Sequence, residues 1–388
     1  MAPQPNMPFR AARISVAAAF LVNGFANGTW VSRIPEVKRA AGLGTGALGL
    51  ALLGMTVGAL MAMPLSGVWM ARLGSRRIVT LCTFLLCASL SLPAFASGWW
   101  SLALSLLAFG AASGAMDVSM NAQAVAVEKG LGRPIMSSFH GLWSVGGMGG
   151  AALGGWMASR GFAPLAHFAA VGAALAAGAL VAGRWLLHED AWTEEREPAF
   201  GRPLRALAGL GAIAFCALLG EGAVGDWSSL YLSRGLGAGP GAAAMGYAAF
   251  STCMAAGRLS GDRLVHRFGP VGVVRTSGLM AAAGLLVALA VGQTWAAIAG
   301  FALVGAGFAT VVPLVFSAAG NTPGVSPGPA LASVATTGYL GFLAGPPSIG
   351  LSAEVIGLRV SLGIVAALSL AMALLAPTVR RGAPEDGM

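Results

Sequence analysis

Long apolar stretches recur along almost the whole chain, and they restrict its fold more than any other feature. The first four cover residues 16–31, 47–70, 78–97 and 101–126. With its flanking residues, each stretch reaches the roughly 20 residues that a helix needs to cross about 30 Å of hydrocarbon. The pattern continues to the end of the chain and predicts twelve spans, near 12–32, 46–71, 78–97, 100–127, 135–158, 164–187, 206–231, 241–260, 273–292, 295–318, 329–352 and 358–379.

The composition agrees with a chain that is solvated by lipid. Charged residues make up 10% of it and hydrophobic residues 56%, whereas a soluble domain carries about 25% charged residues. A backbone that crosses a membrane must satisfy its own hydrogen bonds, so it forms either helices or a closed barrel. The stretches do not alternate apolar and polar residues, as barrel strands of about ten residues do. The predicted fold class is an all-α polytopic membrane protein, in which many of the 58 glycines let helices approach closely.

The basic residues predict the orientation of the chain in the membrane. The formal net charge is +9, and the positive-inside rule explains it better than nucleic-acid binding does. If the N-terminus is cytoplasmic, most of the 23 Lys and Arg residues fall on the cytoplasmic side; the exceptions are Arg33, Lys38, Arg39, Arg160, Arg234 and Arg359. We therefore expect a protein of the bacterial cytoplasmic (inner) membrane with both termini in the cytoplasm and no nucleic-acid partner.

The sequence contains no motif for a metal or a nucleotide. The four cysteines lie inside expected spans without the spacing of a metal site. No Walker A sequence is present. We expect no cofactor and no metal, so the energy for any transport must come from a gradient of a solute or an ion.

The chain consists of two similar halves. The hydrophilic segment 188–205 reads HEDAWTEEREPAFGRPLR and interrupts the apolar pattern near the middle. On either side of it similar features occur in the same order, for example Gly28 and Trp30 in one half and Gly225 and Trp227 in the other. We expect a six-helix bundle over 1–187, a cytoplasmic linker over 188–205 and a second six-helix bundle over 206–388. Such like-oriented repeats are typical of carriers with a central site.

The loop between the second and third expected spans resembles a known signature. Residues 67–77 read GVWMARLGSRR and are similar to the loop motif G-x-L-a-D-R-x-G-R-R of the major facilitator superfamily. The resemblance covers the whole chain and implies two pseudo-symmetric six-helix bundles that transport by alternating access. It also implies that Arg72, Arg76 and Arg77 dock on the neighbouring bundle as part of a gate. Ala71 occupies the usual Asp position, so the familiar Asp–Arg lock cannot form there.

A second copy of this motif lies in the other half of the chain. It runs from Arg258 through Asp262 to Gly269, and because it keeps the acid, we expect Arg258 and Asp262 to carry the gating role. The stretches 28–35 (GTWVSRIP) and 116–123 (MDVSMNAQ) resemble the fucose-permease-related carriers, in particular the YbjJ-like branch. This resemblance does not identify the substrate, because fold does not give function.

Few ionisable residues lie inside the expected spans, where each costs about 2.5–3.5 kcal/mol on insertion scales. Glu221 lies between two glycines in the middle of the seventh span, where a carboxylate facing a cavity can carry a proton. Asp117 in the fourth span has Asn121 one turn later on the same face, and the resemblance to fucose permease implies a coupling role for it. His140 in the fifth span can relay protons. The alternative for each is a fixed structural hydrogen bond.

Other polar and aromatic residues of the spans are candidates for binding the solute. They are Asn23, Asn27, Trp30, Asn121, Gln123, Trp227 and Tyr339. The resemblance implies that spans 1, 4, 7 and 10 line the cavity, while the alternative for the tryptophans is anchoring at the membrane interface. Near the outer side, Arg33 and Asp226 form a candidate gate between the bundles; the alternative for Asp226 is an exposed acid.

Together these features predict a secondary active transporter that moves a small polar organic solute, sugar-like or another metabolite, with protons by symport and alternating access. The alternative is an efflux pump that exchanges drugs or metabolites for protons. A cavity rich in Met and aromatic residues would favour efflux, whereas convergent amides and acids favour a polar solute. An enzyme is not expected, because the acids and histidines are scattered over several spans. We expect a monomer whose partners are the solute, protons and the lipid bilayer.

Overall fold

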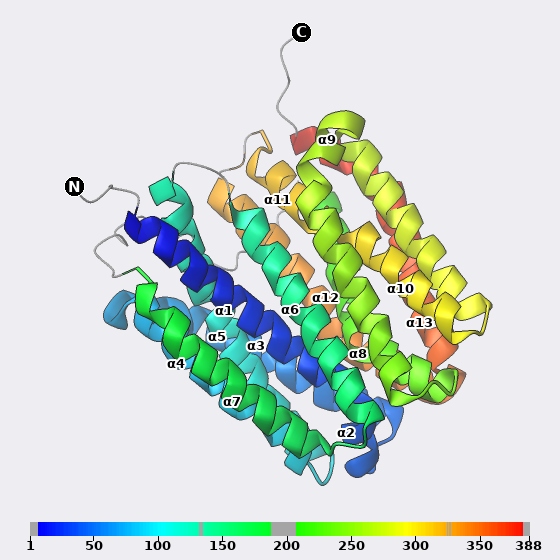
Figure 1. The fold of residues 1–388 in the computed structure, drawn as a ribbon. Coiled ribbons are helices and arrows are strands. Elements are labelled where there is room, and N and C mark those ends of the chain that lie inside the picture. Colours follow the sequence, from blue (N-terminus) through cyan, green and yellow to red (C-terminus); the bar gives the residue numbers. More distant parts are fainter. Residues whose placement is uncertain (1–6, 132–134, 188–206, 324, 326, 383–388) are drawn as a thin grey trace. The chain divides into compact units, whose positions relative to one another are not determined.

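The computed structural model describes residues 7–131, 135–187, 207–323, 325 and 327–382, and all regular elements among these residues are helical (Figure 1). The chain divides into two compact units. Unit 1 is Met1–Glu194 with Gly239–Ala248, and unit 2 is Glu195–Ala238 with Ala249–Met388. The expected linker, 188–205, lies outside the described residues. The division into bundles over 1–187 and 206–388 stays a prediction.

The described residues of unit 1 before position 188 form seven α-helices and two short 3-10 helices. They are α1 (Met7–Ser32), α2 (Ile34–Ala40), α3 (Thr45–Leu73), α4 (Ser75–Ser89), η1 (Leu92–Phe95), α5 (Trp99–Leu131), α6 (Met136–Ser159), α7 (Pro164–Ala182) and η2 (Gly183–Trp185). The short helix α2 is not among the expected elements. Pro35 lies in its first turn, where the fixed backbone angle of proline favours the start of a helix.

Unit 2 contains the remaining elements. They are α8 (Ala208–Leu230), the π-helix η4 (Tyr231–Gly235), α9 (Pro240–Ala290, of which the first residues belong to unit 1), α10 (Thr294–Phe308), α11 (Val311–Gly320), α12 (Pro327–Ile356), α13 (Leu358–Leu375) and the 3-10 helix η5 (Ala376–Gly382). α9 covers two expected spans, which Gly269 separates with a φ of 68°, followed by Pro270. The expected span 295–318 is divided into α10 and α11.

Nine helices of the described residues are long and apolar enough to cross a membrane. The three expected spans missing from this set are 135–158, 241–260 and 329–352, which coincide with α6, the first part of α9 and α12. Glycine and serine lower the mean hydropathy of α6, and the first part of α9 carries Arg258, Asp262 and Arg263. The all-helical membrane fold is confirmed, whereas the count of twelve spans stays a prediction.

The backbone repeats its turns in the two halves of the chain. Six glycines with positive φ form three matching pairs, 195, 195 and 196 residues apart: Gly42 with Gly237, Gly74 with Gly269, and Gly161 with Gly357. Gly74 ends α3 with a φ of 93°, a conformation that residues with a Cβ rarely adopt. The order of loops in the sequence repeat is therefore also present in the backbone.

Glycines let α1 pack directly against α6 within unit 1 (Figure 1). A Cβ at Gly28 would overlap the carbonyl of Gly147, and one at Gly150 would overlap the carbonyl of Phe25. In unit 2, α8 and α12 approach in the same way, because a Cβ at Gly341 would overlap the carbonyl of Phe215. Such backbone contact holds helices together where lipid removes the hydrophobic drive, and it brings the polar residues of α1, α5 and α6 within reach of one another.

Candidate functional site

Unit 2 holds an ion pair between α8 and α9. Nη2 of Arg258 lies 3.3 Å from Oε1 of Glu221. The two side chains are 17% and 15% exposed, so both charges are largely shielded from the surroundings. A guanidinium that donates to a carboxylate makes a charge-assisted hydrogen bond. The sequence predicts a role for each residue but not their contact, which depends on how the two helices pack.

Two glycines flank Glu221 on α8 and lie against aromatic side chains of α10 and α12. A Cβ at Gly220 would lie 2.5 Å from the ring of Phe308, and a Cβ at Gly222 would lie 2.9 Å from the ring of Phe342. Both distances are shorter than the optimal carbon–carbon separation of about 3.5–4.0 Å. A side chain larger than glycine at either position would displace one of these rings, so the glycines leave room for aromatic side chains on both sides of Glu221.

A buried hydrogen-bond network joins α1, α5 and α6 in unit 1. Trp143 Nε1 donates to Asn23 Oδ1 over 2.9 Å, and Asn27 Nδ2 donates to the same oxygen over 3.1 Å. The amides of Asn23 and Asn27 both donate to Ser113 Oγ, over 3.4 and 3.3 Å. Asn23 and Asn27 are 2% and 8% exposed, so these bonds replace water as partners.

The polar face of α5 continues from this network. Asn121 Nδ2 donates to the carbonyl of Asp117 over 2.8 Å and to its Oδ1 over 3.2 Å. Both side chains are half-buried, and the predicted placement on one face is confirmed. The sequence interpretation missed Ser113, although its position four residues before Asp117 is a signal that finds it. Ser113, Asp117 and Asn121 form one polar stripe, which is the candidate solute-facing surface of unit 1.

Gln123 lies in a structural clamp and not on this stripe. Its Nε2 donates to Ser75 Oγ over 2.6 Å and to the carbonyl of Leu187 over 3.0 Å, and the N–H of Leu187 donates back to Oε1 over 3.0 Å. The side chain is 1% exposed. The amide joins the residues after η2 to the start of α4 and is occupied on both sides. These contacts favour a structural role over the predicted binding of a solute.

The predicted tryptophans lie in the cores of the two units. Trp30 is 1% exposed and Trp227 is 0% exposed. Neither indole N–H has a hydrogen-bond partner among the described residues. These positions favour packing over the predicted contact with a solute. His140 and Tyr339 are half-buried, and the His140 ring meets Phe20 edge-on with 5.2 Å between centroids.

Arg33 is buried within unit 1. Its Nη2 donates to the carbonyl of Phe162, and its Nε lies 4.0 Å from Oε1 of Glu36. Burial lowers the pKa of Arg33, and the charge of Glu36 acts in the opposite direction. These contacts join the end of α1 to the connection between α6 and α7. Asp226 is half-buried on α8 of unit 2, and its pairing with Arg33 stays a prediction.

The arginines of the motif at residues 67–77 lie at the end of α3 and the start of α4. Arg72 and Arg77 are exposed, and Arg76 Nη2 donates to the carbonyl of Arg184 over 3.2 Å. In the second copy of the motif, the side chain of Asp262 lies outside the described part of the chain. The gating role of these residues stays a prediction.

Comparison with known proteins identifies relatives along the whole chain. A family model described as Major Facilitator Superfamily matches residues 16–325. An uncharacterised MFS-type transporter of Yersinia pestis is 39% identical over 378 residues, which cover 97% of this chain and 98% of the relative. Membrane protein MosC of Rhizobium meliloti is 36% identical over 363 residues, which cover 92% of this chain and 88% of the relative.

Solved transporter structures share the fold. The crystal structure of nucleoside transporter NupG matches with a TM-score of 0.70 and 15% identity, over 97% of this chain and 99% of that one. A D-xylose-proton symporter matches with a TM-score of 0.70 and 14% identity, over 97% and 98% of the two chains. FucP in the outward conformation matches with a TM-score of 0.63 and 16% identity, over 97% and 99%. At these identities the likeness shows the fold alone.

Proposed function

Because the chain belongs to the Major Facilitator Superfamily, we propose that it is a secondary active transporter that moves a small polar organic solute by alternating access, coupled to protons. Membership of the family confirms the resemblance seen in residues 67–77. The half-buried ion pair between Glu221 and Arg258 is the observation that carries the proton coupling. It is a charged contact between two helices at a position where an unpaired charge is costly.

Protonation of Glu221 would remove the attraction between the two charges and so destabilise the conformation in which the pair forms. Two unit charges 3.3 Å apart attract by about 5 kcal/mol at an effective dielectric constant of 20, and the cost of desolvating the two ions is subtracted from this. Shifting a two-state equilibrium from roughly 1:99 to 99:1 takes about 5.5 kcal/mol. Loss of the pair supplies part of that free energy, and preferential binding of the solute to one state supplies the rest.

The polar stripe of α5 supports a solute with several hydroxyl or amide groups. Ser113, Asp117 and Asn121 offer a hydroxyl, a carboxylate and an amide on one face. The similar structures are named as transporters of nucleosides, D-xylose and fucose, which all carry several hydroxyl groups. We place the solute beside this stripe. The amides of Asn23 and Asn27 behind it become available if the buried network opens.

The basic residues support a location in the bacterial inner membrane with both termini in the cytoplasm. This orientation follows from the positive-inside rule. A fluorescent protein that matures only in the cytoplasm, fused after Met388, tests it. Fluorescence of the fusion is expected. A fusion that is fully expressed but dark would show that this end of the chain is not in the cytoplasm and would contradict the proposed orientation.

The coupling is tested with the purified full chain in proteoliposomes. Uptake of labelled nucleosides, D-xylose and L-fucose is measured with and without an acidic exterior, for the wild type, Glu221→Gln and Glu354→Gln. Glu354 is an exposed acid of α12 and provides the matched control for the same chemical change. Exchange of internal for external solute, without any gradient, reports whether each variant still binds and translocates.

The wild type and Glu354→Gln are expected to accumulate at least one of these solutes only when the exterior is acidic. Glu221→Gln is expected to lose accumulation and to retain exchange. Accumulation by Glu221→Gln at the wild-type level would remove Glu221 from the coupling. Movement of the solute from the lumen to the acidic exterior would instead support the alternative function, efflux by exchange for protons.

A further inference from the structure

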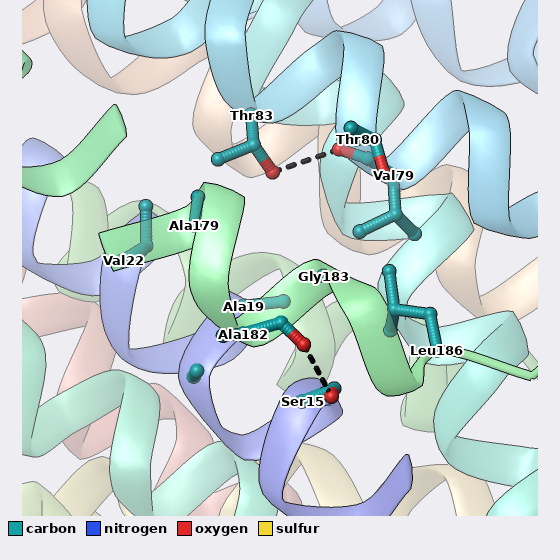
Figure 2. Close-up of a pocket in the computed structure, with 11 residues that line it drawn as sticks. Ser15, Ala19, Val22, Val79, Thr80, Thr83, Ala179, Ala182, Gly183 and Leu186 are labelled. Atoms are coloured by element: carbon teal, nitrogen blue, oxygen red, sulfur yellow. Dashed lines mark hydrogen bonds between the residues drawn. The ribbon is translucent and has the colours of Figure 1, made fainter. Parts of the chain in front are cut away.

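Hydroxyl groups on the helices of unit 1 commonly donate to backbone carbonyls. In the close-up of Figure 2, Thr83 donates to the carbonyl of Val79 over 2.7 Å. On α5, Ser105 and Ser119 each donate to the carbonyl four residues earlier, over 2.7 and 2.9 Å. Such a bond uses the only O–H of the side chain. Ser113 on the same helix is different, because it accepts both of the side-chain hydrogen bonds that it forms.

The direction of the hydrogen bonds around Ser113 is fixed by Trp143. An indole N–H can only donate, so the atom of the Asn23 amide that lies 2.9 Å from Trp143 Nε1 is the oxygen. The nitrogen of the same amide lies 3.4 Å from Ser113 Oγ and donates to it. The amide nitrogen of Asn27 lies beside two oxygens of Asn23, over 2.9 and 3.1 Å, and 3.3 Å from Ser113 Oγ. Both amides therefore donate to the hydroxyl oxygen.

Ser113 is thereby left as a hydrogen-bond donor. A serine hydroxyl has two lone pairs and one O–H, and the two amides occupy both lone pairs. Within the described part of the chain, no acceptor takes the O–H. The side chain is half-buried and lies on the polar stripe with Asp117 and Asn121, so its O–H is available to a solute beside that stripe.

The other two residues of the stripe present acceptors. Nδ2 of Asn121 has two N–H groups, which the carbonyl and Oδ1 of Asp117 accept. The second oxygen of an ionised Asp117 and the amide oxygen of Asn121 remain, and both can only accept. Four helical residues rise about 6 Å, so the donor at Ser113 and the first acceptor are separated by about 6 Å along α5. A single sugar ring bridges such a distance.

We propose that Ser113 determines the specificity of transport by donating to a solute oxygen that only accepts, such as a ring-ether or carbonyl oxygen. Hydroxyl groups on the opposite edge of the solute donate to Asp117 and Asn121. A solute hydroxyl at Ser113 is disfavoured, because its own hydrogen would need a further acceptor. The substrate class is thus a hydroxylated ring compound with an ether or carbonyl oxygen on one edge. This assignment rests on the proposed function, since it needs a polar solute beside α5.

Solute exchange by the full chain in proteoliposomes tests the assignment without any proton gradient. The labelled solute is the best-exchanged member of the panel of nucleosides, D-xylose and L-fucose. Competing analogues each lack one oxygen: deoxy compounds for the hydroxyls, a carbocyclic compound for the ring oxygen and a deoxo compound for a base carbonyl. The variants are Ser113→Ala and Ser113→Thr, which keeps the hydroxyl. Ser105→Ala is the matched control, because the Ser105 hydroxyl is bonded to the Ser101 carbonyl of its own helix.

Ser113→Ala is expected to raise the half-saturating concentration about 2- to 12-fold, the effect of losing one neutral hydrogen bond. Ser113→Thr and Ser105→Ala are expected to stay near the wild-type value. The analogue without the ring or carbonyl oxygen is expected to bind the wild type more weakly by the same factor, and to bind Ser113→Ala as well as the parent solute does. Equal effects of every oxygen deletion on the wild type and Ser113→Ala would overturn the assignment, as would coupling of Ser113 to a solute hydroxyl.

Cysteine labelling tests the position of Ser113 whatever the solute is. Ser113→Cys and the control Ser119→Cys are made with Cys253→Ala, since the other three native cysteines are buried. Ser119 is 0% exposed on the same helix. A charged thiol reagent is expected to modify Ser113→Cys, more slowly when the exchanged solute is present, and to leave Ser119→Cys unmodified. A folded Ser113→Cys protein that resists the reagent would overturn the assignment.

The assignment and the proposed function fail in different ways. Loss of proton coupling appears as absent accumulation with normal exchange, and exchange that couples to Ser113 then still supports the assignment. Exchange that is independent of Ser113 overturns the assignment alone. Absence of exchange for every solute of the panel overturns both.

Discussion

The contact between α1 and α6 makes Gly28→Ala a sensitive test of the packing of unit 1. The added methyl carbon would overlap the carbonyl oxygen of Gly147 and lie 2.8 Å from its carbonyl carbon. An ordinary contact is about 3.5–4.0 Å, so the two helices must separate locally by at least about 0.7 Å. A gap of about 0.5–1 Å already forfeits a quarter to a half of the dispersion energy at each neighbouring contact.

The expected cost follows from the kind of atom that must move. Overpacking a well-packed core costs about 1–3 kcal/mol, and the upper part of this range applies because the obstacle is backbone. Alanine recovers about 1 kcal/mol of helix propensity relative to glycine, so the net loss is about 1–2 kcal/mol. For a unit of this size each kcal/mol lowers the melting temperature by about 2–4 °C, which predicts a fall of about 2–8 °C.

The assay is thermal unfolding of the purified protein in one detergent, compared with Gly178→Ala. Gly178 lies in α7 with nothing within 4 Å of an added Cβ, so the control keeps the gain in propensity without the overlap. Gly178→Ala is expected to melt at or above the wild-type temperature. The reasoning fails if Gly28→Ala melts no lower than Gly178→Ala.

Three further predictions concern the polar contacts. Asn23→Leu leaves the indole N–H of Trp143 without its acceptor, which costs about 1–3 kcal/mol, and a lower melting temperature in thermal unfolding checks this; an unchanged melting temperature would show that this hydrogen bond adds nothing to stability. Gln123→Leu leaves the backbone N–H and carbonyl of Leu187 without these hydrogen-bond partners and is expected to lower stability by a similar amount. Equal stability of the variant and the wild type would argue against the clamp. In a double-mutant cycle with Glu221→Gln and Arg258→Gln, the stability loss of the double variant is expected to be about 0.5–3 kcal/mol smaller than the sum of the two single losses. Strictly additive losses would mean that the pair is not formed.

The fold was largely predictable because its signals are local. Apolar length alone places most of the helices, and the paired turns at Gly74 and Gly269 follow from the repeated loop motif. The helix α2 was missed because seven residues next to a long apolar run leave no separate periodic signal. The break between α10 and α11 was missed as well, since Phe308 and Val311 lie inside one continuous apolar stretch.

The candidate site was predictable within helices but not between them. Asp117 and Asn121 meet because residues four apart share a helix face. The contact between Glu221 and Arg258 joins two helices, and no spacing in the sequence encodes it. Gln123 has the polarity of a solute ligand, and only the tertiary structure shows that Ser75 and the backbone of Leu187 occupy its amide.

Solute-driven proton entry into proteoliposomes tests the central claim most directly. A pH-sensitive dye trapped in the lumen is followed when the best-transported solute of the panel is added outside, with no pre-formed pH gradient. The wild type is expected to acidify the lumen as the solute enters. Glu221→Gln is expected to leave the luminal pH unchanged although it still exchanges internal for external solute, and acidification by this variant at the wild-type rate would contradict the account.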